Sequence, residues 1–163
     1  MSVQIAIDNY DDLFSDFDIR DYSERYISSD FLNELRLRAN KVKNENDINI
    51  IFIVGDKERN VEYEKIIAGR LKTFFNNRYE SNKNKRRKIL LGMFLFELIG
   101  IIFMLLAIYI EKYASVYLKD FLLIPSWFFI WNGFEKYINN KKIVDRNIKY
   151  YSKLIKSTIT FKS

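Results

Sequence analysis

The sequence predicts an integral membrane protein in which a two-helix transmembrane hairpin is joined to a small cytoplasmic α/β (α+β) domain built from both ends of the chain. Three observations support this prediction: a long apolar run, a shorter apolar run after it, and basic residues that flank the pair on one side. The expected parts are a cytoplasmic α/β domain at 1–82, the hairpin at 83–138, and a cytoplasmic helix with a terminal strand at 139–163 that packs on the N-terminal domain.

The beginning of the chain predicts a strand, a loop and a helix. Val3–Ile7 alternates weakly, as a short strand does. Residues 8–25 are acidic and aromatic, but they lack the central glycine and the ligand spacing of an EF-hand, so we expect an ordered loop without calcium. Ser28-Ser29-Asp30 offers N-cap oxygens to a helix at Phe31–Lys43. One face of that helix is apolar and contains Phe31, Leu35, Ala39 and Val42.

The rest of the predicted cytoplasmic part comes from two distant segments. Ile48–Val54 is rich in β-branched residues and is the best strand candidate in the chain. A helix is expected from about Glu58, with a break before the membrane at Ser81-Asn82. After the membrane segments, an amphipathic helix at Asn139–Lys156 is followed by a strand at Thr158–Phe161. We expect this last strand to pair with Ile48–Val54 and to close the domain.

Ile89–Ile110 is predicted to be the first membrane span, TM1. Its 22 residues contain one charged residue, Glu97. As a helix it would measure about 33 Å, which exceeds the roughly 30 Å of a hydrocarbon core. A helix of this length in a soluble bundle normally keeps a polar stripe, and this segment has none.

The second predicted span, TM2, covers about 119–138. Its apolar part, Phe121–Phe134, has 14 uncharged residues, so a full crossing needs the residues that follow it. Lys and Tyr side chains can reach an interface from there. A re-entrant or interfacial helix is the alternative. Trp127, Trp131 and Glu135 form one stripe at spacings of four residues.

Basic residues set the expected orientation. Five of them precede TM1: Lys83, Lys85, Arg86, Arg87 and Lys88. Others follow TM2, whereas the loop between the spans has no net charge. Because positive residues stay in the cytoplasm, both termini are predicted to be cytoplasmic in a multi-pass protein of the cell membrane. The basic residues are expected to contact anionic lipid rather than nucleic acid.

Polar residues inside the spans are candidate functional residues. Burying an ionisable group in a membrane is costly, so Glu97, Asn132 and Glu135 are singled out. Folding the hairpin sets Glu97 at the depth of Asn132 and Gly133, and Gly100 on the same face would allow close approach of another helix. One interpretation is a polar line for ions or protons. The other is a hydrogen bond from Asn132 to Glu97 that holds the hairpin or an oligomer together.

Two stretches have a recognisable pattern. Tyr10–Leu35 includes Phe17-Asp18-x-Arg20 and Glu24-Arg25, and the second stretch is Trp127-x-x-x-Trp131-x-x-x-Glu135 with a basic segment and a short strand after it. These stretches resemble a widespread family of uncharacterised prokaryotic two-pass membrane proteins. Asn132-Gly133-Phe134 stands where that family has Arg-Pro-Leu. The resemblance implies the topology and no chemistry, since that family carries no established activity.

Composition excludes several classes of function. The chain has 163 residues, no Cys and no His, and a formal net charge of +6. It therefore has no disulfides, no zinc site of the Cys/His kind and no catalytic thiol or imidazole. It also has no glycine-rich phosphate loop. We expect a protein that is not an enzyme and that binds no cofactor and no metal.

Two functions remain as predictions. The first is a membrane-anchored, non-enzymatic module whose cytoplasmic domain recruits or senses a protein or small ligand, and which forms a homo-oligomer. The second is an oligomeric ion channel or membrane-perturbing effector that uses Glu97 in the membrane. Ion flux in liposomes would separate the two.

Overall fold

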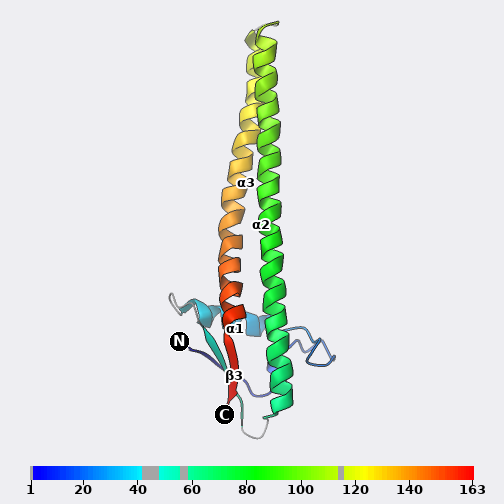
Figure 1. Ribbon diagram of the computed structural model, residues 1–163, viewed down its shortest axis with the longest axis vertical. Coiled ribbons are helices and arrows are strands. Elements are labelled where there is room, and N and C mark those ends of the chain that lie inside the picture. Colours follow the sequence, from blue (N-terminus) through cyan, green and yellow to red (C-terminus); the bar gives the residue numbers. More distant parts are fainter. Residues whose placement is uncertain (1, 42–47, 56–58, 114–115) are drawn as a thin grey trace. The chain divides into compact units, whose positions relative to one another are not determined.

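The computed structural model describes residues 2–41, 48–55, 59–113 and 116–163, which form two compact units. The sheet domain comprises Met1–Tyr79 and Lys149–Ser163. The helical unit comprises Glu80–Ile148. Both ends of the chain belong to the sheet domain (Figure 1).

Seven elements follow one another in the described parts of the chain. They are β1 (Ser2–Ala6), the 3₁₀ helix η1 (Tyr10–Leu13), α1 (Ser29–Lys41), β2 (Asn49–Ile53), α2 (Val61–Glu111), α3 (Val116–Lys156) and β3 (Thr158–Lys162). The helix expected at Phe31–Lys43 is α1, although Val42 and Lys43 lie outside the described residues, as does the expected helix start at Glu58.

The three strands form one parallel sheet in the order β1-β2-β3. Ile50 lies opposite Val3 on one side and Ile159 on the other. The predicted pairing of the last strand with the strand at Ile48–Val54 is confirmed (Figure 1). Parallel neighbours need long connections, and here they are α1 between β1 and β2, and the whole of α2 and α3 between β2 and β3.

One face of the sheet holds the hydrophobic core. Alternate residues of β1 and β2 point into it, as the period of two requires. The predicted apolar face of α1 packs there, since Phe31, Leu35 and Ala39 are buried. The lower part of α2 and the end of α3 complete the core with Ile67, Leu71, Phe75 and Leu154, all fully buried.

The opposite face of the sheet is more open. The sequence of β2 predicts apolar residues on both faces, and Ile51 and Ile53 lie on this second face. Ile51 is half-buried and Ile53 is 40% exposed. The sheet domain is therefore a two-layer arrangement in its described residues, with helices against one face.

The prediction of a two-helix transmembrane hairpin is wrong. Among the described residues, α2 alone is long and apolar enough to cross a membrane, over Val61–Ile110. The apolar part of α3 is not long or apolar enough to cross a membrane. It is short, it lies between charged residues, and its tryptophan, serine, asparagine and proline residues lower its mean hydropathy. Its Pro125 lies inside the helix.

The predicted helix boundaries are also wrong on both sides of the apolar segments. α2 continues through Ser81-Asn82 without a break, and α3 runs through Asn139. Neither site has the glycine or proline that normally ends a helix. Asn82 is buried, and its Oδ1 accepts a hydrogen bond of 3.4 Å from Asn147 Nδ2. This asparagine therefore joins α2 to α3 instead of ending a helix.

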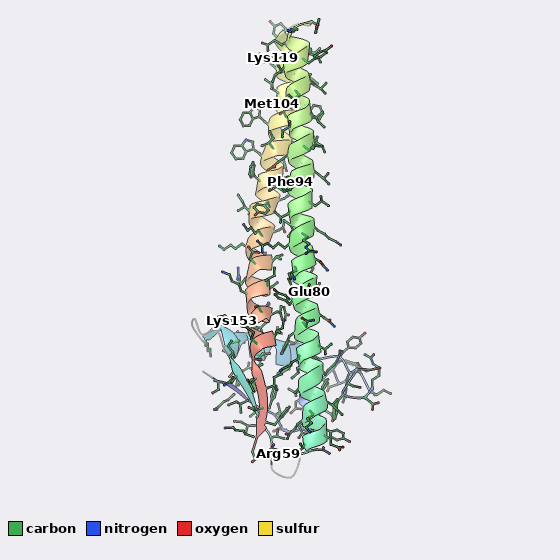
Figure 2. The ribbon with its side chains drawn as sticks, in the orientation of Figure 1. Arg59, Glu80, Phe94, Met104, Lys119 and Lys153 are labelled. Atoms are coloured by element: carbon green, nitrogen blue, oxygen red, sulfur yellow. The ribbon has the colours of Figure 1, made fainter. Side chains whose placement is uncertain are left out.

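The apolar part of α2 is almost unburied. Only 6% of its most apolar stretch of 18 residues is buried within the chain. Phe94 and Met104 belong to this part, and their side chains are largely exposed (Figure 2). A core helix of a soluble protein would be covered here. This exposure supports association of the protein with a membrane.

Amide exchange tests the placement of β3. Val54 N–H donates to the Lys162 carbonyl oxygen over 2.8 Å, and this register directs the amides of Thr160 and Lys162 toward β2. The amides of Ile159 and Phe161 then point to the open edge. We expect Thr160 and Lys162 to exchange at least about tenfold more slowly than Ile159 and Phe161. Equally rapid exchange at all four would mean that β3 is a free tail.

Candidate functional site

A loop over residues 14–28 projects from the sheet domain and is closed at its base. Phe14 and Ile27 form an isolated antiparallel bridge. Ser15 N–H donates to the Tyr26 carbonyl oxygen over 2.8 Å, and Ser28 N–H to that of Leu13 over 3.0 Å. The loop predicted at 8–25 is thus ordered, and it begins with the turn of η1.

An ion pair fixes the tip of this loop. Asp18 accepts hydrogen bonds from Arg20 Nε (2.9 Å) and Nη2 (2.8 Å), and a third from the backbone of Tyr26 (2.7 Å). The Arg20 guanidinium lies 4.7 Å from the centroid of the Tyr26 ring. These hydrogen bonds, that of Arg20 first, hold the pKa of the Asp18 carboxyl well below its usual range.

A second ion pair ties the loop to η1, and hydrogen bonds tie it to α2. Arg25 Nη1 and the Tyr22 hydroxyl both donate to Asp11 Oδ1. Burial, then the bond to Asp11, raises the pKa of Tyr22. Arg70, on α2, donates to the carbonyl oxygens of Arg25 (3.1 Å) and Glu24 (3.2 Å). The loop is therefore held against α2 by contacts between residues far apart in the sequence.

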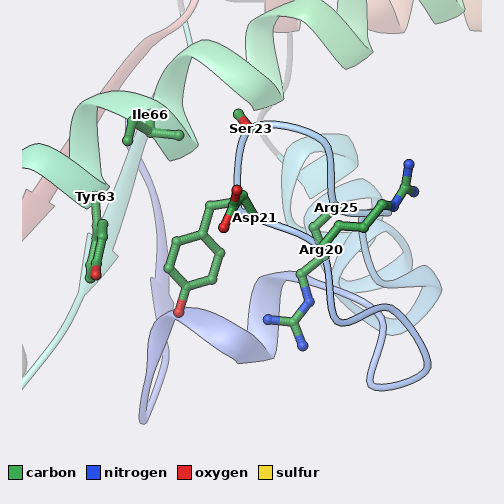
Figure 3. A pocket seen from close by; sticks show the side chains of 7 residues that line it. Arg20, Asp21, Ser23, Arg25, Tyr63 and Ile66 are labelled. Atoms are coloured by element: carbon green, nitrogen blue, oxygen red, sulfur yellow. The ribbon is translucent and has the colours of Figure 1, made fainter.

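A pocket of about 320 Å³ lies between this loop and the first turns of α2. The loop supplies Arg20, Asp21, Tyr22, Ser23 and Arg25, and α2 supplies Tyr63 and Ile66 (Figure 3). The Arg25 Nε is buried and has no hydrogen-bond partner among the described residues. The lining thus combines guanidinium groups, one carboxylate and aromatic rings, which suits a small polar group rather than an apolar one.

Tyr10 packs against Tyr22 and Tyr63, the two aromatic side chains that line the pocket. Tyr63 contacts the rings of Tyr22 and Tyr10 edge-on, at centroid distances of 5.4 and 6.5 Å. The Tyr10 hydroxyl donates to Glu64 Oε1 (3.1 Å) and accepts from the backbone N–H of Asn60 (2.9 Å). Burial is the main cause that raises the pKa of Tyr10. Arg59 holds the Glu64 carboxylate with two hydrogen bonds.

Replacing Tyr10 with phenylalanine is expected to destabilise the sheet domain by about 1–2 kcal/mol. The change removes one hydroxyl, leaves the Asn60 N–H without its acceptor, and takes one hydrogen bond from the Glu64 carboxylate, which keeps its two bonds from Arg59. The measurement is the free energy of opening from amide exchange at β2. Tyr117→Phe on α3 is the control, because Tyr117 is 85% exposed. Equal stability of the two variants would contradict the importance of this network.

Two apolar side chains project from the loop tip without cover. Phe17 is 100% exposed and Ile19 is 96% exposed. They flank Asp18, whose ion pair fixes the backbone between them. Large apolar side chains held rigidly in water are typical of contact surfaces.

The helical unit contains the predicted intramembrane residues, and its two helices pack closely. A Cβ on Gly100 would lie 2.7 Å from Ile130 Cγ1 and 3.0 Å from the Ser126 carbonyl oxygen. Ser126 Oγ donates to the Gly100 carbonyl oxygen over 2.8 Å. The predicted close approach at Gly100 is confirmed.

The predicted bond between Asn132 and Glu97 is not formed. Asn132 Nδ2 donates instead to the carbonyl oxygen of Phe128, one turn earlier in α3, over 2.8 Å. The expected depth is right, because a Cβ on Gly133 would lie 3.7 Å from Glu97 Cγ. Glu97 Oε1 is buried and has no hydrogen-bond partner among the described residues. Glu97 therefore faces the backbone of α3 without a polar partner there.

The remaining predicted residues of α3 lie on its outer side. Trp127, Trp131 and Glu135 are exposed, so this stripe does not face α2. Side chains with this exposure are available to lipid or to a partner. The structure brings none of the three to Glu97.

The predicted basic residues divide into paired and unpaired groups. Lys83 pairs with Glu80 over 3.2 Å, and Arg86 pairs with Asp145 over 3.5 Å. Within the described parts of the chain, Lys85, Arg87 and Lys88 form no ion pair. These three keep their full charge for an external anion.

Sequence reasoning missed the pocket. The available signals were Arg20, Arg25 and Tyr22 in one loop, but their separate pairing with Asp18 and Asp11 depends on how the loop closes. Comparison with models of protein families, with curated proteins and with solved structures finds no match. The resemblance to two-pass membrane proteins therefore stays a hypothesis.

Proposed function

We propose that the protein is a membrane-anchored, non-enzymatic module whose sheet domain recruits a partner protein in the cytoplasm through the loop at 14–28. One observation carries the anchoring: the apolar part of α2 has only 6% of its most apolar stretch buried. Such a surface needs an apolar solvent, and its length fits a bilayer.

The basic residues of α2 that precede its apolar part support a cytoplasmic sheet domain. Lys83, Lys85, Arg86, Arg87 and Lys88 lie at the end of the apolar segment that connects to this domain. Positive residues at that position keep the adjoining part of the chain in the cytoplasm. Since β1 and β3 flank β2, both chain ends share the location of the sheet.

Recruitment rests on the exposed loop tip and on the pocket beside it. Phe17 and Ile19 would supply the apolar contact, and the pocket would take a polar side chain of the partner. A lipid surface fits this loop poorly, because residues 1–30 carry a net charge of −6. The two arginines of the pocket are held by carboxylates, and guanidinium is a poor proton carrier, which supports binding rather than catalysis.

Labelling tests the anchor and the location. The chain has no native cysteine, so single cysteines at Ser2 and Ser163 report separately. We expect the protein in the membrane fraction after alkaline extraction, with Ser2→Cys and Ser163→Cys unreactive toward an impermeant reagent in intact cells and reactive after lysis. Reaction of either terminal cysteine from outside would overturn the cytoplasmic location.

Loop variants test recruitment. The double variant Phe17→Ser with Ile19→Ser should reduce the mass of the complex extracted from membranes, whereas Leu37→Ser, on exposed α1, should not. Both variants should keep the circular dichroism of the wild type, since none of the three side chains is buried. An unchanged complex in the loop variant would refute the proposed surface.

An ion-conducting assembly is the second candidate, and one observation favours it. The buried Glu97 Oε1 lacks a partner in the described chain, and such an atom is suited to bind water, a proton or a cation. Liposomes containing wild-type protein would then show flux that Glu97→Gln abolishes. Impermeable liposomes would leave the recruitment module as the function.

A further inference from the structure

A second cavity, of about 160 Å³, lies within the helical unit between α2 and α3. Its walls come from α2 residues between Ile89 and Phe96 and from α3 residues between Gly133 and Asn140. Two of the wall positions are glycines: Gly92 faces open space, with no heavy atom within 4 Å of a Cβ built on it, whereas a Cβ on Gly133 would lie 3.2 Å from Phe96 Cβ. The polar lining is limited to Lys136 and Asn140, at one end of the α3 wall.

The polar end of the cavity points toward the basic residues. Gly133 lies against Phe96, and Asp145 pairs with Arg86, so higher numbers in α3 accompany lower numbers in α2. Lys136 and Asn140 therefore lie at the end where the apolar run of α2 begins. The apolar walls extend from there toward the membrane interior.

Positive charge at this end is not neutralised by the described residues. No carboxylate lines the cavity. The Lys136 Nζ lies 4.2 Å from the centroid of the Phe96 ring and forms no ion pair with a described residue. Lys88 lies one helical turn before Gly92, on the same face of α2, and likewise forms no ion pair within the described part of the chain. The Asn140 Nδ2 donates one hydrogen to the Lys136 carbonyl oxygen and has a second to offer.

We propose that this cavity binds one anionic phospholipid of the cytoplasmic leaflet, with part of an acyl chain along the apolar walls and the phosphate at Lys136 and Asn140. The proposal rests on the membrane anchoring proposed above. A free phosphate ion would leave the apolar walls exposed to water, and a zwitterionic lipid would bring a positive ammonium group to this basic end together with its phosphate. An anionic lipid covers the apolar walls with its acyl chain and places a net negative charge beside Lys136.

Native mass spectrometry of the full-length protein in detergent tests the site. The probes are phosphatidylglycerol and phosphatidylcholine with identical acyl chains. We expect one phosphatidylglycerol to remain bound, with at least about fivefold preference over phosphatidylcholine, since a basic residue at the membrane surface contributes about that factor. Equal retention of the two lipids would overturn the headgroup part of the proposal. Displacement of the lipid by millimolar inorganic phosphate would overturn the choice of a lipid.

Two variants address the two ends of the cavity separately. Lys136→Gln should weaken the binding of phosphatidylglycerol about fivefold and that of phosphatidylcholine by less, because the latter has no net negative charge. Gly92→Phe fills the cavity and should remove both lipids. A Cβ at Gly92 has no heavy atom within 4 Å, so the added side chain enters open space. The milder Gly92→Leu should lower retention in the same direction.

Matched controls change the same property outside the cavity. Lys141→Gln removes one positive charge from the next part of α3, and Leu91→Phe adds an aromatic ring to an exposed position of α2. Both should retain lipid within about twofold of the wild type. If Lys136→Gln and Gly92→Phe also bind as the wild type does, the site is refuted. A protein found in the soluble fraction of cells would instead refute the anchoring itself.

Discussion

Replacing Phe52 with alanine is expected to cost the sheet domain about 3–5 kcal/mol. Phe52 is fully buried in β2, the middle strand of the sheet, and its ring centroid lies 5.8 Å from that of Phe31 and 5.1 Å from that of Phe161. Truncation leaves a cavity where α1, β2 and β3 meet. Because domains of this kind have a total stability of about 5–15 kcal/mol, a large part of it would be lost.

Ile53→Ala is the matched control for that experiment. Ile53 follows Phe52 on the same strand but points to the open face, where it is 40% exposed. Its truncation should cost no more than about 1 kcal/mol. Amide exchange at β2 in the detergent-solubilised protein measures both variants. If both variants lost a similar free energy of unfolding, the assignment of the hydrophobic core to the face that carries Phe52 would be refuted.

The Gly100→Ala variant is expected to loosen the packing of α2 against α3 by about 1–3 kcal/mol. The new methyl group would lie 3.0 Å from the backbone oxygen of Ser126, which cannot move away as a side chain can. Thermal unfolding of the helices in detergent gives the change. Ser126→Ala should cost less, about 0.6 kcal/mol, because it removes a single hydrogen bond.

The same substitution at Gly92 has the opposite expected sign. No heavy atom lies within 4 Å of a Cβ at Gly92, so Gly92→Ala should stabilise α2 by about 0.5–1 kcal/mol through helix propensity alone. The pair thus separates close packing from the general effect of glycine. Stabilisation by both changes would contradict the close approach at Gly100.

The sequence was sufficient for the strands and for one helix face. Ile48–Val54 and Thr158–Phe161 are recognisable because β-branched and alternating residues suit a pleated surface. Phe31, Leu35 and Ala39 have the spacing of a helix face, and all three are buried. These patterns lie within single elements, so they can be recognised without knowledge of the tertiary contacts.

The helix ends and the second span were less predictable, because they depend on tertiary contacts. Asn82 looks like a helix break in isolation, and its bond with Asn147 becomes visible only when the helices are side by side. The apolar run at Phe121–Phe134 suggested a span, but 14 residues flanked by charges do not make one by length and composition. The pocket beside the loop could not be predicted either, because it depends on the contact of Arg70 with Arg25, two residues that are 45 positions apart in the sequence.

The long separation of β2 from β3 in the sequence has a consequence for biosynthesis. β2 is complete at Ile53, but its partner begins at Thr158, so translation of the intervening segment takes on the order of 5–20 s at 5–20 residues per second. During this time one edge of β2 is unpaired, and the apolar part of α2 is made before the sheet can close. An unpaired edge readily accepts a foreign strand. A nascent chain of this protein therefore needs the edge of β2 protected until β3 is synthesised.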